Sequence, residues 1–234
     1  MDRTLWPSIV LLLAIFAVFE LTPLDLIVQD WFYDFDQASW LVDQKAFWPR
    51  VFFYNGPKYV IIAFAVALLV FSVGPRRWLK RVSPRLRKRD LCVVLATLAT
   101  GPSLIALSKA TTNVFCPYDI ERYGGKVPYV KVLESYPQGQ RPEKRGRGFP
   151  AGHASGGYAL MSLAGLWFTR KGRWTGFAVG MSLGTLMGVY QMFKGAHYLS
   201  HTVVTVFVCW ILFLVWRRVF HAAEERAGIF SAGS

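Results

Sequence analysis

The chain has 234 residues, 53% of them hydrophobic, yet it carries a formal net charge of +13 and has a mean hydropathy of +0.31. A positive mean hydropathy beside 27 lysines and arginines is unusual unless apolar and basic residues occupy separate segments. They do, because apolar runs of roughly 15–20 residues alternate with charged stretches. This segregation indicates an integral membrane protein and excludes a basic nucleic-acid binder.

Six apolar segments predict an all-α, six-span transmembrane helical bundle that forms a single domain over residues 1–234. The segments lie at about 5–21, 59–73, 91–107, 155–168, 175–193 and 202–216. The first has no small-residue cleavage pattern after it, so we interpret it as an uncleaved span rather than a signal peptide. The aromatic and aspartate-rich stretch between the first two spans is typical of a segment at the membrane interface.

Basic residues indicate which way the chain crosses the membrane. Fifteen of the 27 lie in the N-terminus, in the linker 76–89, in the turn after the fourth span and in the C-terminal tail. Because short cytoplasmic loops carry an excess of lysine and arginine, both termini are expected in the cytoplasm and the chain in the cytoplasmic (inner) membrane. The loops 109–153 and 194–201 are then expected on the outer, or periplasmic, side.

The fifth predicted span carries a stripe of small residues. Gly176, Gly180, Gly184 and Gly188 recur every four residues, so they share one helix face. Such a stripe lets another helix approach closely. We expect it to pack within the bundle rather than to form a dimer contact.

Three of the four histidines fall at the outer ends of predicted spans. His153 follows Pro150 and Gly152 at the start of the fourth span, where free backbone N–H groups predict an anion site. His197 and His201 are four residues apart, so on a helix their rings share a face and one can orient the other. These loops are where we expect the chemistry.

Two lysines add positive charge to this end of the bundle. Lys109 ends the third span, and Lys194 precedes His197 by three residues. A histidine nucleophile, a second histidine, fixed cations and a helix N-terminus are what phosphoryl transfer without a metal requires. A metal site made from the three histidines and Cys116 is an alternative, although nothing in the spacing demands a metal, and no cofactor is predicted.

The candidate residues occur in three short motifs. These are Lys109-x6-Cys116-Pro117, Pro150-Ala151-Gly152-His153 and Gly195-Ala196-His197-x3-His201. Their order resembles that of the type 2 phosphatidic acid phosphatase superfamily, six-span lipid phosphatases related to vanadium haloperoxidases. The resemblance implies a haloperoxidase-like core in which Lys109 and Gly152 bind phosphate. It also implies that His153 is the general acid and His197 the nucleophile that forms a phosphohistidine.

The chain departs from the family pattern at several positions. Cys116 replaces an arginine, Ala151 a serine, Tyr190-Gln191 a Ser-Arg pair, and His201 the aspartate that orients the nucleophile. Each lost arginine removes a bidentate clamp on phosphate. The departures allow two interpretations: a decayed site, or a variant site in which charge has been relocated.

We favour the variant site. Lys194 lies one helical turn beyond Gln191, whose amide can still donate to a phosphate oxygen, and Arg147 lies in the same outer loop. His201 can accept a proton from the His197 ring, and Asp119 is a candidate for the missing orienting charge. We therefore assign His197, His153 and His201 as catalytic, and Lys109, Lys194, Gly152, Gln191 and Arg147 as phosphate-binding.

The sequence thus predicts a metal-independent membrane phosphatase that hydrolyses a phosphomonoester or pyrophosphate of a lipid at the outer face of the membrane. Phosphatidic acid, phosphatidylglycerol phosphate, undecaprenyl pyrophosphate and lipid A all fit a cationic outer site. The same phosphohistidine would serve a lipid phosphotransferase. A non-catalytic protein that binds lipid through a degenerate site is the alternative from another class. The expected partners are a phosphorylated lipid and the bilayer, without nucleic acid.

Overall fold

A computed structural model describes residues 4–232 of the chain, with side chains through Glu225. Nearly all of its regular structure is helical, with one two-stranded antiparallel hairpin. The elements are α1 (Leu5–Leu21), α2 (Leu24–Asp30), β1 (Tyr33–Asp34), β2 (Ser39–Trp40), α3 (Phe47–Arg50), the π-helix η1 (Val51–Asn55), α4 (Gly56–Val73), α5 (Arg76–Val82), α6 (Lys88–Thr112), the 3-10 turns η2 (Pro117–Asp119) and η3 (Glu121–Tyr123), α7 (Gly152–Ala159), the 3-10 segment η4 (Leu160–Leu166), α8 (Arg170–Phe193) and α9 (Leu199–Ala232).

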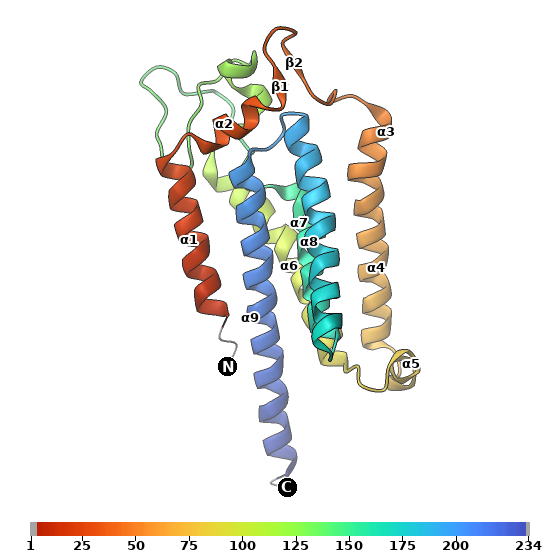
Figure 1. Cartoon of the computed structure of the whole chain (residues 1–234). Helices are drawn as coiled ribbons and strands as arrows, with labels where there is room; N and C mark the ends of the chain where they lie inside the picture. The colour runs from red at the N-terminus through yellow and green to blue at the C-terminus, as the bar shows by residue number, and fades with distance from the viewer. Residues whose placement is uncertain (1–3, 233–234) are drawn as a thin grey trace.

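Helices lie at each of the six predicted spans, and their axes run along one another (Figure 1). Three helical stretches of the described chain are long and apolar enough to cross a membrane: Phe47–Val73, Lys88–Asp119 and Leu199–Glu225. A fourth is added if α1 and α2, bent by 73° where they meet, count as one span. The fourth predicted span divides into the short α7 and η4, and α8 is rich in glycine, which lowers its hydropathy. Six crossings therefore stay a prediction.

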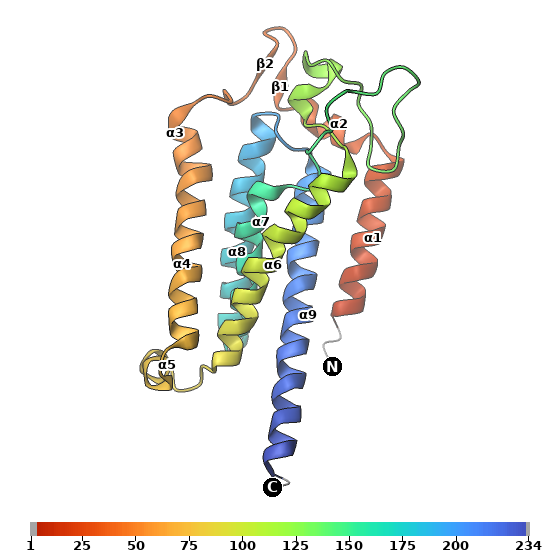
Figure 2. The same cartoon turned by 180° about the vertical axis from the view of Figure 1, so that it is seen from behind.

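The two ends of the bundle differ in what they carry. The start of α1, the basic linker around α5 and the end of α9 lie at one end (Figure 1). The helix α2, the hairpin and the long loop between α6 and α7 lie at the other end, and the view from behind agrees (Figure 2). The linker 76–89, the start of α8 and the end of α9, which carry basic residues used to predict orientation, thus share one end of the molecule, whereas Arg3 lies outside the described residues.

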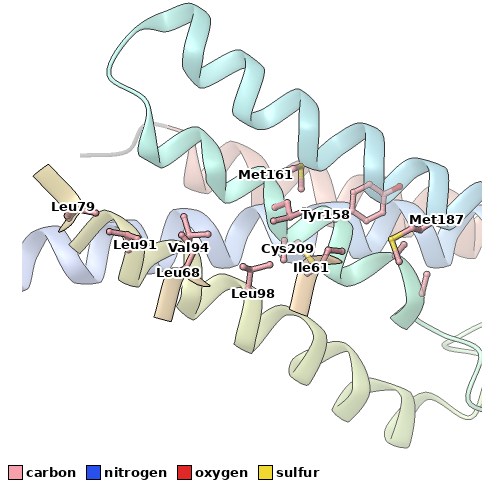
Figure 3. Close-up of a cluster of buried hydrophobic side chains, with 14 residues drawn as sticks. Ile61, Leu68, Leu79, Leu91, Val94, Leu98, Tyr158, Met161, Met187 and Cys209 are labelled. Atoms are coloured by element: carbon pink, nitrogen blue, oxygen red, sulfur yellow. The ribbon is translucent and has the colours of Figure 1, made fainter. Parts of the chain in front are cut away.

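The core encloses the helix that begins with the predicted anion site. Tyr158 of α7 and Met161 of η4 are buried together with Ile61 of α4, Leu98 of α6 and Cys209 of α9 (Figure 3). Removing such large side chains from an aqueous or lipid environment and packing them closely gains dispersion energy at many contacts. The surrounding helices therefore fix the position of α7.

The glycine stripe of α8 faces α7 and η4. A Cβ atom placed on Gly180 would lie 2.1 Å from the backbone nitrogen of Met161, and one on Gly184 would lie 2.3 Å from the ring of Tyr158. Neither site has room for any side chain. The prediction that the stripe packs within the bundle is confirmed.

This packing predicts the effect of a larger residue in the stripe. Gly180→Leu forces α8 away from the η4 backbone, and overpacking of this kind costs roughly 3 kcal/mol. The midpoint of thermal aggregation in detergent micelles should fall by several degrees. Val179→Leu is the matched control, because Val179 is 46% exposed on the same helix and its change should leave the midpoint unaltered. Equal midpoints for the two variants would contradict the packing described here.

Candidate active site

The three predicted histidines meet at one end of the bundle. His153 is the second residue of α7, His197 lies in the loop before α9, and His201 lies in the first turn of α9. Nδ1 of His153 is 3.2 Å from Nε2 of His197, and Nδ1 of His197 is 3.3 Å from Nδ1 of His201. His197 and His201 are each 1% exposed. The structure therefore joins the rings in a line with His197 at its centre.

A backbone carbonyl helps to orient the central ring. The Gly148 carbonyl lies close enough to the rings of His197 and His201 to accept a hydrogen bond from either of them. A neutral imidazole carries a single N–H, so a proton that His197 holds at Nδ1, toward His201, leaves the lone pair on Nε2. That nitrogen faces His153. The sequence could not predict this role of Gly148, because every residue has a backbone carbonyl and the residue type does not show which one contacts a histidine.

The segment before α7 is docked on the start of α9. The N–H of Ala151 donates to the His201 carbonyl at 3.1 Å and to the Thr205 hydroxyl at 3.0 Å. The N–H of Gly148 donates to the Val114 carbonyl at 2.6 Å. Two segments about fifty residues apart are thus joined through the backbone N–H of Ala151. This docking, rather than side-chain packing alone, sets the distance between His153 and His197.

Lys109 lies where the sequence predicts it. A Cβ atom on Gly152 would be 3.3 Å from Nζ of Lys109, so the ammonium group sits against the first turn of α7. The free N–H groups of that turn and the lysine both favour an anion. Glycine at this position also lets the lysine approach the backbone closely.

Further cations come from α3 and α4, which sequence reasoning did not connect with the site. Lys58 of α4 is close enough to affect His153, and Arg50 of α3 affects Lys194 in the same way. Nζ of Lys194 lies 5.1 Å from the centre of the Tyr190 ring, within the range of a cation–π contact. Together with Lys109, these groups give the site the positive charge that its lost arginines would otherwise supply.

Burial and these cations control the protonation of the histidines. Burial lowers the pKa of His197 well below its ordinary value, and the charge of Lys109 lowers it further. Burial, followed by Lys109 and the other nearby lysines, likewise lowers the pKa of His153. Burial and the neighbouring Arg50 lower the pKa of Lys194. Both imidazoles are therefore neutral at neutral pH before an anion binds.

Gln191 is completely enclosed. Its side chain is 1% exposed, and its amide nitrogen and oxygen have no hydrogen-bond partner among the described residues. Leaving such groups unpaired costs roughly 1–3 kcal/mol. The sequence expectation that this amide donates to a phosphate oxygen therefore stays a prediction, although its hydrogen-bonding groups are unpaired at the end of α8.

Other predicted residues have different surroundings. The Asp119 carboxylate accepts a hydrogen bond from the N–H of Cys116 at 3.3 Å, and no hydrogen bond between Asp119 and His197 is found among the described residues. Arg122 forms an exposed ion pair with Asp30. Arg147 has no described hydrogen bond or ion pair, and its role in phosphate binding stays a prediction. Within the described residues, no three His, Cys, Asp or Glu side chains are placed to hold a metal ion.

A buried aspartate from α2 supports the first turn of α9. The Asp25 carboxylate accepts hydrogen bonds from the backbone N–H of Ser200, at 2.8 Å, and from the Ser200 hydroxyl. It thus satisfies one of the free N–H groups at the helix start and places negative charge at its positive end. The sequence signal was an acidic residue within the apolar run Leu24–Val28, but sequence does not say which helix it caps.

Comparison with known proteins gives one result about the family. Residues 90–225 match the profile of the PAP2 superfamily. The chain belongs to the PAP2 superfamily. Neither the curated proteins nor the solved structures gave a match. Membership in this superfamily fits phosphatase-type activity, and the long apolar helices fit a membrane protein.

The part that matches the PAP2 superfamily does not contain the whole site. It includes Lys109 and the three histidines, whose arrangement was expected from the motifs. Asp25, Arg50 and Lys58 all precede residue 90 and lie outside the match. The supporting groups on α2, α3 and α4 therefore come from the part of the chain in which family motifs give no guidance.

The cap on α9 makes a prediction about stability. Asp25→Ala removes two hydrogen bonds to a charged acceptor and should destabilise the protein by about 1.5–3 kcal/mol. The midpoint of thermal aggregation in micelles should fall accordingly. Asp43→Ala is the control, because that exposed carboxylate accepts only a local bond from the N–H of Lys45. If both variants melt at the wild-type temperature, Asp25 does not support α9.

Proposed function

We propose that this protein is a membrane lipid phosphatase that hydrolyses a phosphomonoester or a pyrophosphate through a phosphohistidine on His197. The observation that carries the proposal is the 3.2 Å contact between Nε2 of the buried His197 and Nδ1 of His153, beside Lys109. Membership in the PAP2 superfamily supports the same reaction class. A neutral ring with its lone pair on Nε2 is the form of histidine that acts as a nucleophile.

In the first step, Nε2 of His197 attacks phosphorus in line with the bond to the leaving oxygen. The N–P bond forms as the P–O bond breaks, and His153 gives its proton to the leaving alcohol or phosphate. Because the His153 ring is neutral in the free site, the negative phosphate must itself favour the protonated ring when it binds. Phosphorus has to lie between the two rings, so the His153 side chain moves away from His197 as the substrate enters.

In the second step, water replaces the leaving group. The neutral His153 takes a proton from water as the oxygen attacks phosphorus, the N–P bond breaks, and orthophosphate leaves. The proton at Nδ1 of His197 stays there throughout, toward His201. A neutral neighbour such as His201 stabilises the positive charge of the phosphorylated His197 ring less than a carboxylate would. More of that positive charge is therefore balanced by the negative phosphate.

Binding of the phosphate oxygens is assigned to groups that surround this line of histidines. Lys109 and the N–H groups at the start of α7 bind the phosphate oxygens that face α7. Lys194 and the cations of α3 and α4 attract the phosphate over a longer range. The unpartnered amide of Gln191 is a further donor. A site with this many cations favours a diphosphate or a multiply phosphorylated lipid.

The proposed location follows from the two ends of the bundle. The basic segments lie at the end opposite the histidines, which supports cytoplasmic termini and a site at the outer face of the inner membrane. A lipid substrate is favoured because the histidines lie near the ends of long apolar helices. Its headgroup can reach them while its chains stay in the bilayer.

The nucleophile is tested by removing its ring. His197→Ala should lower phosphate release from a panel of lipid phosphates, namely phosphatidic acid, phosphatidylglycerol phosphate, undecaprenyl pyrophosphate and lipid A, by at least about a thousandfold. His153→Ala should cost about 10²–10⁴-fold, as expected for a general acid. The matched control is His221→Ala, since this fourth histidine lies far along α9, and turnover should be unchanged.

The same assay separates the alternatives. Wild-type turnover by the His197→Ala protein would show that the nucleophile is wrongly assigned. Transfer of labelled phosphate to an acceptor lipid, instead of its release as free phosphate, would identify a phosphotransferase. If the folded wild-type protein releases no phosphate from any of these lipids and forms no acid-labile phosphoryl adduct, the site is a binding site only.

The low pKa of His197 predicts the pH dependence of kcat/KM. Protonation removes the lone pair that attacks phosphorus, so activity falls as pH drops through the pKa of this ring. Because burial and Lys109 lower that pKa, the acid limb should lie below the ordinary histidine value of about 6.5. Two substrates whose phosphate pKa values differ provide the control. An acid limb that reports the pKa of His197 falls at the same pH for both substrates, whereas a limb that reports the substrate phosphate shifts with its pKa. A substrate-independent limb at or above pH 6.5 would contradict this assignment.

A further inference from the structure

A large apolar groove lies in the half of the bundle away from the histidines. It has a volume of about 760 Å³ and is bordered by α1, η4, α8 and α9. Leu11 of α1, Met181 of α8 and Trp210 of α9 are among its lining side chains. It separates α1 from α8, since α1 packs on α9 whereas α8 packs chiefly on α7 and η4. The groove shares no lining residue with the proposed active site.

The groove has a charged edge at the start of α8. Arg170 and Arg173 line it, and no Asp or Glu is among the described residues that do so. Neither arginine takes part in an ion pair among the described residues. The neighbouring Trp174 also lines the groove and is 61% exposed, as is typical of a tryptophan at the level of lipid headgroups. One end of the groove is thus cationic and the rest apolar.

The length of the groove matches one leaflet of a bilayer. From Arg170 to Met181, both of which line it, α8 rises by roughly 16 Å at about 1.5 Å per residue. Half of a hydrocarbon core about 30 Å thick is about 15 Å. A fatty acyl chain with its phosphate beside the arginines would therefore extend along the whole groove.

We propose that this groove binds an anionic phospholipid of the leaflet that faces away from the histidines. The two guanidinium groups bind the phosphate and the negative headgroup, since arginine donates paired hydrogen bonds to such oxygens. One acyl chain lies between α1 and α8 and fills the space that these helices leave. The lipid holds α1 against the bundle and is not a substrate, so the proposal does not rest on the proposed function.

The groove tryptophans allow a direct test. The purified protein is reconstituted into phosphatidylcholine vesicles with increasing phosphatidylglycerol, in which one lipid at a time carries brominated chains that quench tryptophan fluorescence. The difference in quenching between the wild-type protein and a Trp174→Phe, Trp210→Phe double variant is the quenching of the two groove tryptophans. We expect phosphatidylglycerol to be preferred over phosphatidylcholine in the groove by roughly thirtyfold, as two arginines near a lipid surface should give.

Two comparisons decide the outcome. Arg170→Gln with Arg173→Gln should bring the preference close to one, whereas Arg76→Gln with Arg77→Gln, on α5 at the same end of the bundle, should leave it unchanged. If the first pair does not fold, the wild-type protein in about 1 M salt serves instead, because screening should reduce the preference severalfold. Equal quenching by the two lipids in the wild-type groove would overturn the proposal. So would a preference that survives both the arginine change and high salt.

Discussion

The geometry of the site depends on the docking of residues 148–151 on the first turn of α9. The N–H of Ala151 is bonded to the His201 carbonyl, and the Gly148 carbonyl reaches the ring of His197. These contacts bring the start of α7 to the start of α9 and leave Nδ1 of His153 3.2 Å from Nε2 of His197. Because main-chain groups cannot change rotamer, the backbone on either side of the histidines is held rigidly, which leaves the His153 side chain as the part that can move.

This docking needs α7 to be held from behind as well. The glycine stripe of α8 permits backbone contact with α7 and η4, so that α7 lies between α6, α8 and α9 with most of its residues buried. On the other side, the Asp25 carboxylate caps α9 and fixes the turn that carries His201. The two halves of the site are thus positioned by separate interactions. Close helix packing positions His153, and a helix cap positions His201.

How far the sequence predicts this molecule depends on the range of each interaction. Local patterns worked: apolar runs located the helices, four-residue spacing paired His197 with His201, and the glycine repeat predicted close packing. The number of crossings was not settled, because a helix enclosed by other helices, such as α7, does not need a full apolar stretch. The roles of Asp25 and Lys58 depend on contacts with residues about a hundred or more positions away, which no local spacing records. The Gly148 carbonyl has no side-chain signature at all.

The positions at which the chain departs from its family share one physical consequence. Where the family pattern has charged residues, this chain has the neutral Gln191 and His201, of which His201 lies against His197, and its cations are on lysines and on α3 and α4. Neutral contacts cost less to bury than unpaired charges when the site is empty. They also leave both imidazoles uncharged until an anion arrives. In the reaction proposed above, the charge of the bound phosphate completes the electrostatics of the site, so a headgroup with more than one phosphate contributes more to protonating His153 than a single phosphate does.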